Sequence, residues 1–388
     1  MRIYLDHNAT TPVRPGVIEA IADALAQPGN ASSVHADGQA ALRRVEAARR
    51  IAGKALCARA EDVVFTSGGT EALNLAFHSA IAAGGAGRIL HSAIEHEAVA
   101  DTANASGLPV EEIPVTLEGV ADLAWLEERL SSWDAQRDGR PVLALMLANN
   151  EIGTIQPVAE AARLVREAGG LTIVDAIQAV GKIPVDFAAL GADYMAISAH
   201  KFGGPQGVGA LIMACDAPAA RHQRGGGQEK GRRSGTLNVA GIAGLGAALE
   251  QAMAGLKDFA TLGALRDRIA AGLKQAAPDL HILGENAQRL PNTLGIAVPG
   301  WKGETQVMAL DLAGFSVSAG SACSSGKAHG SKIGNAVGLD RDTSQGFLRV
   351  SLGWNSTEDE ADAFVKAWSE AHGRARPTSH TTSVEAVS

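Results

Sequence analysis

Short apolar runs alternate with segments of helical spacing along most of this chain, and that alternation constrains the fold more than any other feature. Seven apolar runs are predicted strands: 62–67, 88–92, 110–115, 141–149, 171–176, 194–199 and 207–213. The predicted helices cover 18–25, 40–56, 68–81, 95–106, 121–131, 157–168 and much of 237–276. Because strands that alternate with helices need crossover connections, the pattern predicts an α/β fold with a mostly parallel sheet covered on both faces.

The last third of the chain has a different pattern, which predicts a second, smaller α+β unit. Its predicted strands and helices lie near 294–298, 347–352, 303–312 and 357–371. We therefore expect a large domain over 15–255 and a small domain built from 1–14 and 256–375. The polar tail, 376–388, lacks periodicity and is predicted to be disordered.

Composition argues against several classes of function. The chain has 388 residues and a formal net charge of −8, which argues against a nucleic-acid-binding surface as its main feature. No uninterrupted apolar stretch reaches the length of a membrane span, and the opening "MRIYLDHNATTP" does not read as a signal peptide. Cys57, Cys215 and Cys323 are far apart and show neither metal-type spacing nor a disulfide framework, so the predicted compartment is the cytoplasm.

Polar residues cluster where predicted strands end, which is where ligands bind to open parallel sheets. "TSGGTE" (66–71) follows a strand and opens a helix, so the amides of Gly69 and Thr70 could hold an anion, phosphate above all. The alternative is a capped helix with Thr70 near its N-cap. "NNEIG" (149–153) offers either two carboxamides to a planar polar ligand or a turn built on asparagine chemistry.

Two further strand ends carry an aspartate and a lysine. Asp175 ends a hydrophobic strand, and a carboxylate there needs a partner such as a protonated pyridine nitrogen. Lys201 follows 26 residues later (201 − 175 = 26) in "ISAHKFGGPQG", although taken alone it could be an ordinary loop lysine. A helix-start phosphate site, an aspartate and a lysine on successive strand ends are what pyridoxal phosphate requires. His96 is a candidate stacking partner, and a metal site within 91–97 is disfavoured because the chain has no HExxH motif.

Taken together, these motifs resemble the cysteine desulfurases, the pyridoxal-phosphate enzymes of the aminotransferase class V family that supply sulfur for iron–sulfur clusters. The resemblance covers roughly residues 3–372, and its landmarks stand in family order: "YLDHNATTP" (4–12), "GNASSVH" (29–35), "FTSGGTEALN" (65–74), "EHEAV" (95–99), "NNEIG" (149–153), "VDAIQAVGK" (174–182), "ISAHKFGGPQGVG" (197–209), "RRSGT" (232–236), "SAGSACSSG" (318–326) and "LRVSLG" (348–353). It implies the fold-type I architecture, with a mostly parallel seven-stranded sheet in the large, cofactor-binding domain and a small α+β domain that carries the loop of the catalytic cysteine.

The resemblance also implies roles for individual residues. Cofactor binding falls to Gly69, Thr70, His96, Asn150, Asp175, Gln178, Ser198, His200, Lys201 and Thr236. Lys201 would hold pyridoxal 5'-phosphate covalently as a Schiff base. Asp175 would pair with the pyridinium nitrogen, and Gln178 with the ring oxygen. His96 would stack on the ring and act as a catalytic proton carrier, and no metal is expected in the resting enzyme.

Other residues are expected to bind the substrate and to join two subunits. Asn150 and Arg349 would bind the carboxylate of L-cysteine, for which the planar fork of arginine is suited. Thr236 would reach the cofactor phosphate of the neighbouring subunit, which makes the expected active unit a homodimer.

Two departures from the family stand out. Ala199 occupies a position where glycine is common in the family, and the loop after Cys323 lacks the family's usual sequence around a proline.

Cys323 is the expected nucleophile, because "SAGSACSSG" has the composition of an exposed loop, and Lys327, His329 and Lys332 could favour its thiolate. L-cysteine would be converted to L-alanine, and the persulfide formed on Cys323 would pass to an acceptor such as an iron–sulfur scaffold protein. The alternatives are a free surface thiol, a selenocysteine lyase, a class V aminotransferase and a catalytically inactive binding protein. Cys57 and Cys215, by contrast, are expected in the core.

Overall fold

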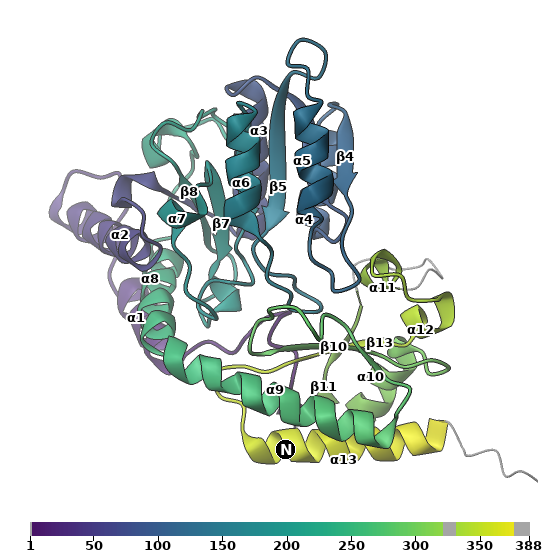
Figure 1. Ribbon diagram of the computed structural model, residues 1–388. Coiled ribbons are helices and arrows are strands. Elements are labelled where there is room, and N and C mark those ends of the chain that lie inside the picture. Colours follow the sequence, from purple (N-terminus) through teal and green to yellow (C-terminus); the bar gives the residue numbers. More distant parts are fainter. Residues whose placement is uncertain (1, 321–330, 376–388) are drawn as a thin grey trace, which may run out of the picture.

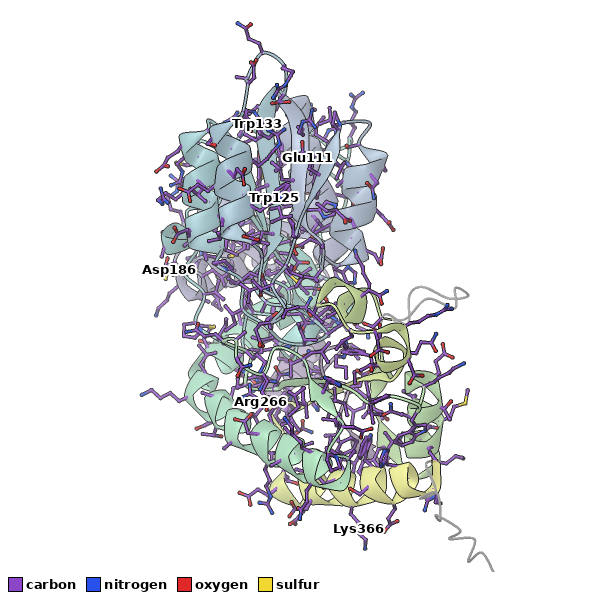
Figure 2. All side chains as sticks on the ribbon, turned by 45° about the vertical axis from the view of Figure 1, so that its right-hand side comes forward. Glu111, Trp125, Trp133, Asp186, Arg266 and Lys366 are labelled. Carbon is purple, nitrogen blue, oxygen red and sulfur yellow. The ribbon has the colours of Figure 1, made fainter. Side chains whose placement is uncertain are left out.

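A seven-stranded sheet occupies one half of the molecule, and a smaller four-stranded sheet lies in the other (Figure 1). The structure is a computed structural model that describes residues 2–320 and 331–375. Cys323 and the tail predicted to be disordered lie outside the described residues. Arg266 and Lys366 mark the half with the smaller sheet and Trp125 the other half, and side chains fill the space between them (Figure 2).

The large sheet confirms the predicted mostly parallel architecture. Its strands lie in the order β2 (Val63–Thr66), β8 (Gly209–Met213), β7 (Tyr194–Ser198), β6 (Leu171–Asp175), β5 (Arg140–Met146), β3 (Ala86–Ser92) and β4 (Val110–Ile113). Neighbouring strands from β7 to β4 pair in parallel, whereas β8 runs antiparallel to both β2 and β7. Each of the seven predicted strands is present, with its ends trimmed or extended by a few residues.

The long helices lie where the apolar periodicity predicts them, whereas the short helices were not predicted. The long helices are α1 (Pro15–Leu25), α2 (Ala36–Ala55), α3 (Gly69–Ala82), α4 (Glu97–Ala105), α5 (Leu123–Ser131), α6 (Val158–Glu167), α8 (Val239–Ala254), α9 (Leu256–Ala276), α10 (Gly303–Leu312) and α13 (Glu358–Ala375). The short ones are α7 (Phe187–Leu190), α11 (Lys332–Ala336) and α12 (Arg341–Gln345). Helices this short have too few apolar positions to show a helical period in the sequence.

The large sheet separates two apolar cores, because successive side chains of a strand point to opposite faces. Along β7, Tyr194 and Ala196 pack with residues of α3 and α4. Met195 and Ile197 pack on the other face with residues of α2, α6 and α8. Every residue of β7 is buried. Burial on both faces explains why these strands appear in the sequence as continuous apolar runs.

The smaller sheet has the order β12 (Ser318–Ala319), β13 (Phe347–Ser351), β10 (Thr293–Ala297) and β9 (His281–Ile282), and all its pairings are antiparallel. Nearby, β1 (Ile3–Tyr4) pairs in parallel with β11 (Phe315–Ser316). A separate apolar core joins this sheet to α9, α10 and α13 around the fully buried Trp368. The exact domain boundaries, 1–14 with 256–375 against 15–255, stay predictions.

Two of the three cysteines do not lie where the sequence predicts them. Cys57 and Cys215 were expected in the core, but both are exposed free thiols. Cys57 follows α2 in the left-handed backbone region, with a φ of 53°, so its side chain turns away from the packed face of the helix. Cys215 follows β8, beyond the last strand residue that packs against a neighbour. Apolar sequence neighbours therefore did not guarantee burial at chain reversals.

Within the described part of the chain, no single helix is long and apolar enough to span a membrane. Only α8 and α9 taken as a pair pass such a test, and they are bent by 66° at their junction.

A buried ion pair anchors the glycine-rich segment 225–235 to the edge of the large sheet. The Arg49 guanidinium donates to both carboxylate oxygens of Glu229, at 2.9 and 2.7 Å, and to the carbonyl oxygen of Val63 at 2.5 Å. Glu229 also accepts a hydrogen bond of 2.9 Å from the N–H of Phe65. The pair thus satisfies backbone groups of edge strand β2. It also holds Glu229 and Lys230 at φ values of 49° and 57°, which residues other than glycine rarely adopt.

Removing one partner of this pair should destabilise the fold strongly. Glu229→Gln would leave Arg49 without its buried counter-ion and with only the more exposed Glu46 as a partner, at a cost of about 3 kcal/mol in the free energy of unfolding. Urea unfolding followed by circular dichroism measures the loss. The matched control is Arg163→Ala, whose ion pairs with Glu160 and Glu167 are exposed and should contribute less than about 1 kcal/mol. Equal effects of the two substitutions would contradict the anchoring role.

Candidate active site

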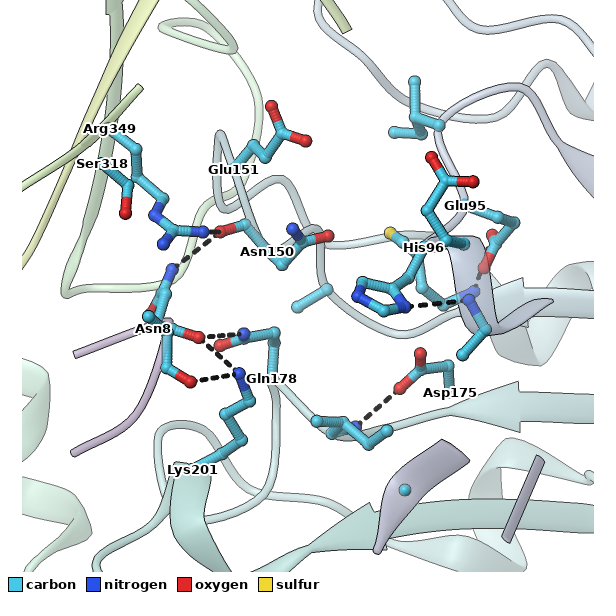
Figure 3. Close-up of a pocket in the computed structure, with 18 of the residues that line it drawn as sticks. Asn8, Glu95, His96, Asn150, Glu151, Asp175, Gln178, Lys201, Ser318 and Arg349 are labelled. Atoms are coloured by element: carbon cyan, nitrogen blue, oxygen red, sulfur yellow. Dashed lines mark hydrogen bonds between the residues drawn. The ribbon is translucent and has the colours of Figure 1, made fainter. Parts of the chain in front are cut away.

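A cavity of about 420 Å³ opens where β5, β6 and β7 end (Figure 3). Met146, Asp175 and Ser198 are the last residues of these strands, and all three line the cavity. The cavity brings together most of the predicted site residues: Gly69, Thr70, His96, Asn150, Asp175, Gln178, Ser198, His200, Lys201 and Arg349. Because Arg349 lies on β13 and Ser318 on β12, the cavity lies between the two sheets.

The predicted lysine and aspartate lie in the same cavity. Lys201 is in the single 3₁₀ turn that follows β7, and its Nζ donates to the carbonyl oxygens of Asn8 and Ala9 at 2.6 and 2.8 Å. Asp175 is 7% exposed, and its Oδ1 accepts a hydrogen bond of 2.9 Å from the N–H of Ile177. Burial raises the pKa of Asp175, and that N–H partly opposes the rise. A cationic N–H partner would stabilise the ionised form of such a buried carboxyl group.

The start of α3 places backbone N–H donors on one side of the cavity. Gly69 and Thr70 are the first residues of this helix, so their N–H groups have no carbonyl acceptor one turn earlier. Ser198 lies beside them: a Cβ atom on Gly69 would be 3.5 Å from that of Ser198 and only 2.1 Å from Cδ1 of Ile177. Burial, followed by the charge of Lys201, lowers the pKa of His200 to about 4, so its imidazole is neutral at neutral pH.

The opposite side of the cavity presents a buried guanidinium. Arg349 is 8% exposed; its Nη1 donates to the carbonyl oxygen of Asn150 at 3.1 Å, and its Nη2 to Oδ1 of Asp6 at 2.7 Å. Its Nε is buried and has no hydrogen-bond partner among the described residues. Because this buried N–H group has no acceptor and belongs to a guanidinium cation, it favours an anionic ligand, such as the carboxylate of an amino acid.

His96 enters the cavity from the N-terminus of α4. Its Nδ1 accepts a hydrogen bond of 3.0 Å from the N–H of Ala98, which makes it the N-cap of the helix. The neutral ring then carries its proton on Nε2. The ring lines the cavity next to Asp175 in Figure 3. This placement is compatible with both predicted roles, stacking and proton transfer.

Two predicted site residues are not among those that line the cavity in the described part of the chain. Thr236 is exposed and does not line the cavity of its own chain. Cys323 lies outside the described residues, as do Lys327 and His329, which were predicted to favour its thiolate. Lys332, the third residue of that group, lines the cavity.

Sequence reasoning missed several polar residues in and beneath the cavity. Asn8 and Glu151 line it, and Lys182 lies buried behind it at 3% exposure. Glu95 is also 3% exposed, and burial raises its pKa well above the ordinary value. Its Oε1 accepts from the N–H of Met146 at 2.9 Å. A polar residue inside an otherwise apolar stretch could have indicated these positions. Such residues are also common at turns, so the pattern alone does not identify a site.

The donor set fits pyridoxal 5'-phosphate. Lys201 supplies an amine for its aldehyde, and Asp175 supplies a buried carboxyl group for its ring nitrogen. The first turn of α3 supplies backbone donors for its phosphate, at a place where a Cβ on residue 69 would collide.

Comparisons with known proteins agree with this fit. The aminotransferase class-V family model matches residues 3–364. The chain is 40% identical to an IscS-like cysteine desulfurase of Mycobacterium tuberculosis, over 96% of this chain and 97% of that protein. It is also 40% identical to a cysteine desulfurase of Cereibacter sphaeroides, over 94% of each chain. A solved NifS-like protein from Rickettsia africae has a TM-score of 0.88 at 32% identity, covering 96% of this chain and 99% of its own.

Substitution of Gly69 should weaken cofactor binding. Gly69→Ala would collide with Ile177, which lines the cavity, and overpacking of about 1–3 kcal/mol should weaken binding of pyridoxal 5'-phosphate by about fivefold or more. Titration followed by the absorbance of the bound cofactor measures the affinity. Gly68→Ala is the matched control, because a Cβ at residue 68 has no neighbour within 4 Å. The same affinity in both variants would argue against a tight approach at residue 69.

Glu151 should make the stability of the fold depend on pH. Burial raises the pKa of Glu151 from 4.5 to about 6, although nearby Arg349 and Lys332 lower it. The folded state thus prefers the neutral acid, and stability is lost as pH rises from about 4.5 through 6. Glu151→Gln, which stays neutral, should therefore be about 2 kcal/mol more stable than the parent at pH 7.5 and similar to it at pH 4.5.

Urea unfolding at the two pH values measures this difference. Exposed Glu19→Gln is the control and should change little at either pH. A pH-independent effect of Glu151→Gln would rule out the buried-acid interpretation.

Proposed function

The chain belongs to the aminotransferase class V family, and we propose on that basis that it is a pyridoxal-phosphate-dependent cysteine desulfurase. It converts L-cysteine to L-alanine and transfers the sulfur to its own Cys323, which places it among the sulfurtransferases. One observation carries the proposal: a lysine, a buried aspartate and a buried arginine from different sequence regions line a single cavity. The named relatives support cysteine as the substrate, because they are cysteine desulfurases and this chain matches them over nearly their whole length.

Each cavity residue has a distinct task in this reaction. Pyridoxal 5'-phosphate, when bound, withdraws electrons from the α-carbon of the amino acid and so weakens its bonds. Asp175 keeps the ring nitrogen protonated, and the first turn of α3 binds the phosphate. Arg349 binds the substrate carboxylate and thereby orients the amino acid. His96 and the ε-amine of Lys201 are the groups that would move the proton at the α-carbon.

Cys323 takes the sulfur. It lies three residues beyond Gly320 (323 − 320 = 3), and Gly320 itself lines the cavity. Its thiolate attacks the sulfur of the substrate, so a sulfur–sulfur bond forms while the bond between sulfur and the β-carbon breaks. The electron pair of the broken bond stays with the β-carbon, which takes up a proton and becomes the methyl group of alanine. The persulfide then passes to an acceptor, such as an iron–sulfur scaffold protein.

The proposed active unit is a homodimer in the cytoplasm. Thr236 is exposed and outside its own cavity, which supports a role toward the cofactor phosphate of a second subunit. The loop before it is firmly held, because Arg233 donates to Glu71 at 2.7 Å in the first turn of α3. The exposed thiols of Cys57 and Cys215 support a reducing compartment.

Stoichiometry tests this function. The purified protein, loaded with pyridoxal 5'-phosphate and supplied with L-cysteine and a thiol reductant, should release sulfide and alanine in equal amounts. Cys323→Ala should keep the absorbance of the bound cofactor but lose at least about a hundredfold in sulfide release, because the proposed nucleophile for the sulfur is gone. Cys57→Ala, at an exposed thiol outside the cavity, is the control and should keep full activity.

Two results would contradict the proposal. Pyruvate and ammonia in place of alanine would show elimination rather than sulfur transfer, and full activity in Cys323→Ala would favour an aminotransferase. Parallel turnover measurements with selenocysteine separate a selenocysteine lyase from a desulfurase.

A further inference from the structure

Asn8 is 1% exposed and joins the parts of the molecule that surround the cavity. Its Oδ1 accepts from Lys182 Nζ at 2.7 Å and from Asn292 Nδ2 at 3.0 Å. Its Nδ2 donates to Thr293 Oγ1 at 2.8 Å and to the carbonyl oxygen of Asn150 at 3.1 Å. The side chain is therefore held from both the large and the small sheet regions, and every polar atom it has is used.

The main chain of Asn8 is equally engaged, and it faces the cavity. Its carbonyl oxygen accepts from Gln178 Nε2 at 2.9 Å and from Lys201 Nζ at 2.6 Å, as Figure 3 shows. The next carbonyl, of Ala9, accepts from the same lysine at 2.8 Å. Two carbonyl oxygens at this distance form a strong site for an ammonium group, which is a hydrogen-bond donor with no acceptor of its own.

Lys182 also supports this turn, through two hydrogen bonds from its buried side chain. Its Nζ donates to two side-chain oxygens, Asn8 Oδ1 and Gln178 Oε1. Lys182 thus connects two residues that line the cavity. Burial, followed by the nearby charges of Lys201 and Arg349, lowers the pKa of Lys182 well below its ordinary value, which reduces the positive charge held near Lys201.

We propose that the carbonyl oxygens of Asn8 and Ala9 are the docking site for the ε-amine of Lys201 whenever it is not bonded to the cofactor, and that the side chain of Asn8 positions them. This inference rests on the proposed function, in which Lys201 would hold the cofactor and would also act as an amine at the substrate. Docking at a fixed place would keep the amine inside the cavity for both tasks. Asn8 is a positioning residue, because it acts on Lys201 and not on the substrate.

The same turn also fixes the substrate-binding arginine. Asp6, two residues before Asn8, accepts a hydrogen bond of 2.7 Å from Arg349, and the N–H of Ala9 donates back to the carbonyl oxygen of Asp6 at 3.0 Å. The docking site for the amine and the anchor of the carboxylate-binding group therefore belong to one short segment. Its position sets the distance between the two groups.

The reactivity of Lys201 in the full-length chain freed of cofactor tests the docking site. Limiting acetic anhydride at pH 8 acetylates amines in proportion to their neutral, accessible fraction, and mass spectrometry compares Lys201 with exposed Lys257 as an internal reference. Docking on two carbonyl oxygens protects Lys201, because a hydrogen bond to a charged group contributes roughly 1.5 kcal/mol. Asn8→Ala should therefore raise the Lys201 to Lys257 labelling ratio about tenfold.

Two further variants complete the experiment. Lys182→Met removes one of the bonds to the Asn8 side chain with little change of volume and should raise the ratio by a smaller factor, about threefold. Asn104→Ala, at an exposed site on α4, is the matched control and should leave the ratio unchanged.

An unchanged ratio in natively folded Asn8→Ala overturns the docking site and leaves Asn8 a purely structural residue. If Asn8→Ala fails to fold, Lys182→Met decides in the same way. The labelling uses no cysteine, so its outcome is separate from that of the sulfide and alanine measurement, which tests the proposed function.

Discussion

Parallel pairing of β5, β6 and β7 is the constraint on which the site depends. The register places Met146 opposite Asp175, and Asp175 opposite Ala196, so three strands end at nearly the same level. Parallel strands put all their carboxyl ends on one edge of a sheet, and the side chains that follow must meet there. Asp175 and Lys201 therefore line one cavity although a whole crossover connection separates them.

Burial is the second determinant, and it shifts the pKa values of four titratable groups in and around the cavity. The pKa values of Asp175 and Glu95 are raised and those of Lys182 and His200 are lowered, and in each case desolvation is the largest cause. Burial thus favours the neutral form of each of these groups. Few charged side chains then compete with a bound anion or a cationic ring nitrogen for hydrogen bonds and ion pairs. This environment favours pyridoxal 5'-phosphate and an amino acid as ligands.

The large sheet alone does not complete the site. Arg349 comes from β13 of the smaller sheet, and Asn8 from the segment after β1, and hydrogen bonds link both to Asn150 on the large-sheet side. These contacts join regions that are up to 199 residues apart in sequence. The side of the cavity that includes Arg349 therefore exists only when the two sheets are packed together, which couples the geometry of the cavity to the stability of that interface.

The sequence determined the strands, the long helices, the parallel sheet and the strand-end positions of Asp175 and Lys201, because apolar periodicity and glycine-rich turns are local properties. Its motifs also pointed to the family and to Gly69, Gln178 and Arg349 as ligand-binding residues. Only the tertiary structure decided that Lys201 donates to the carbonyl oxygen of Asn8, that Lys182 is buried, and that Cys57 is exposed. Such facts depend on which distant segments exclude water from a side chain, and no local pattern of residues specifies that.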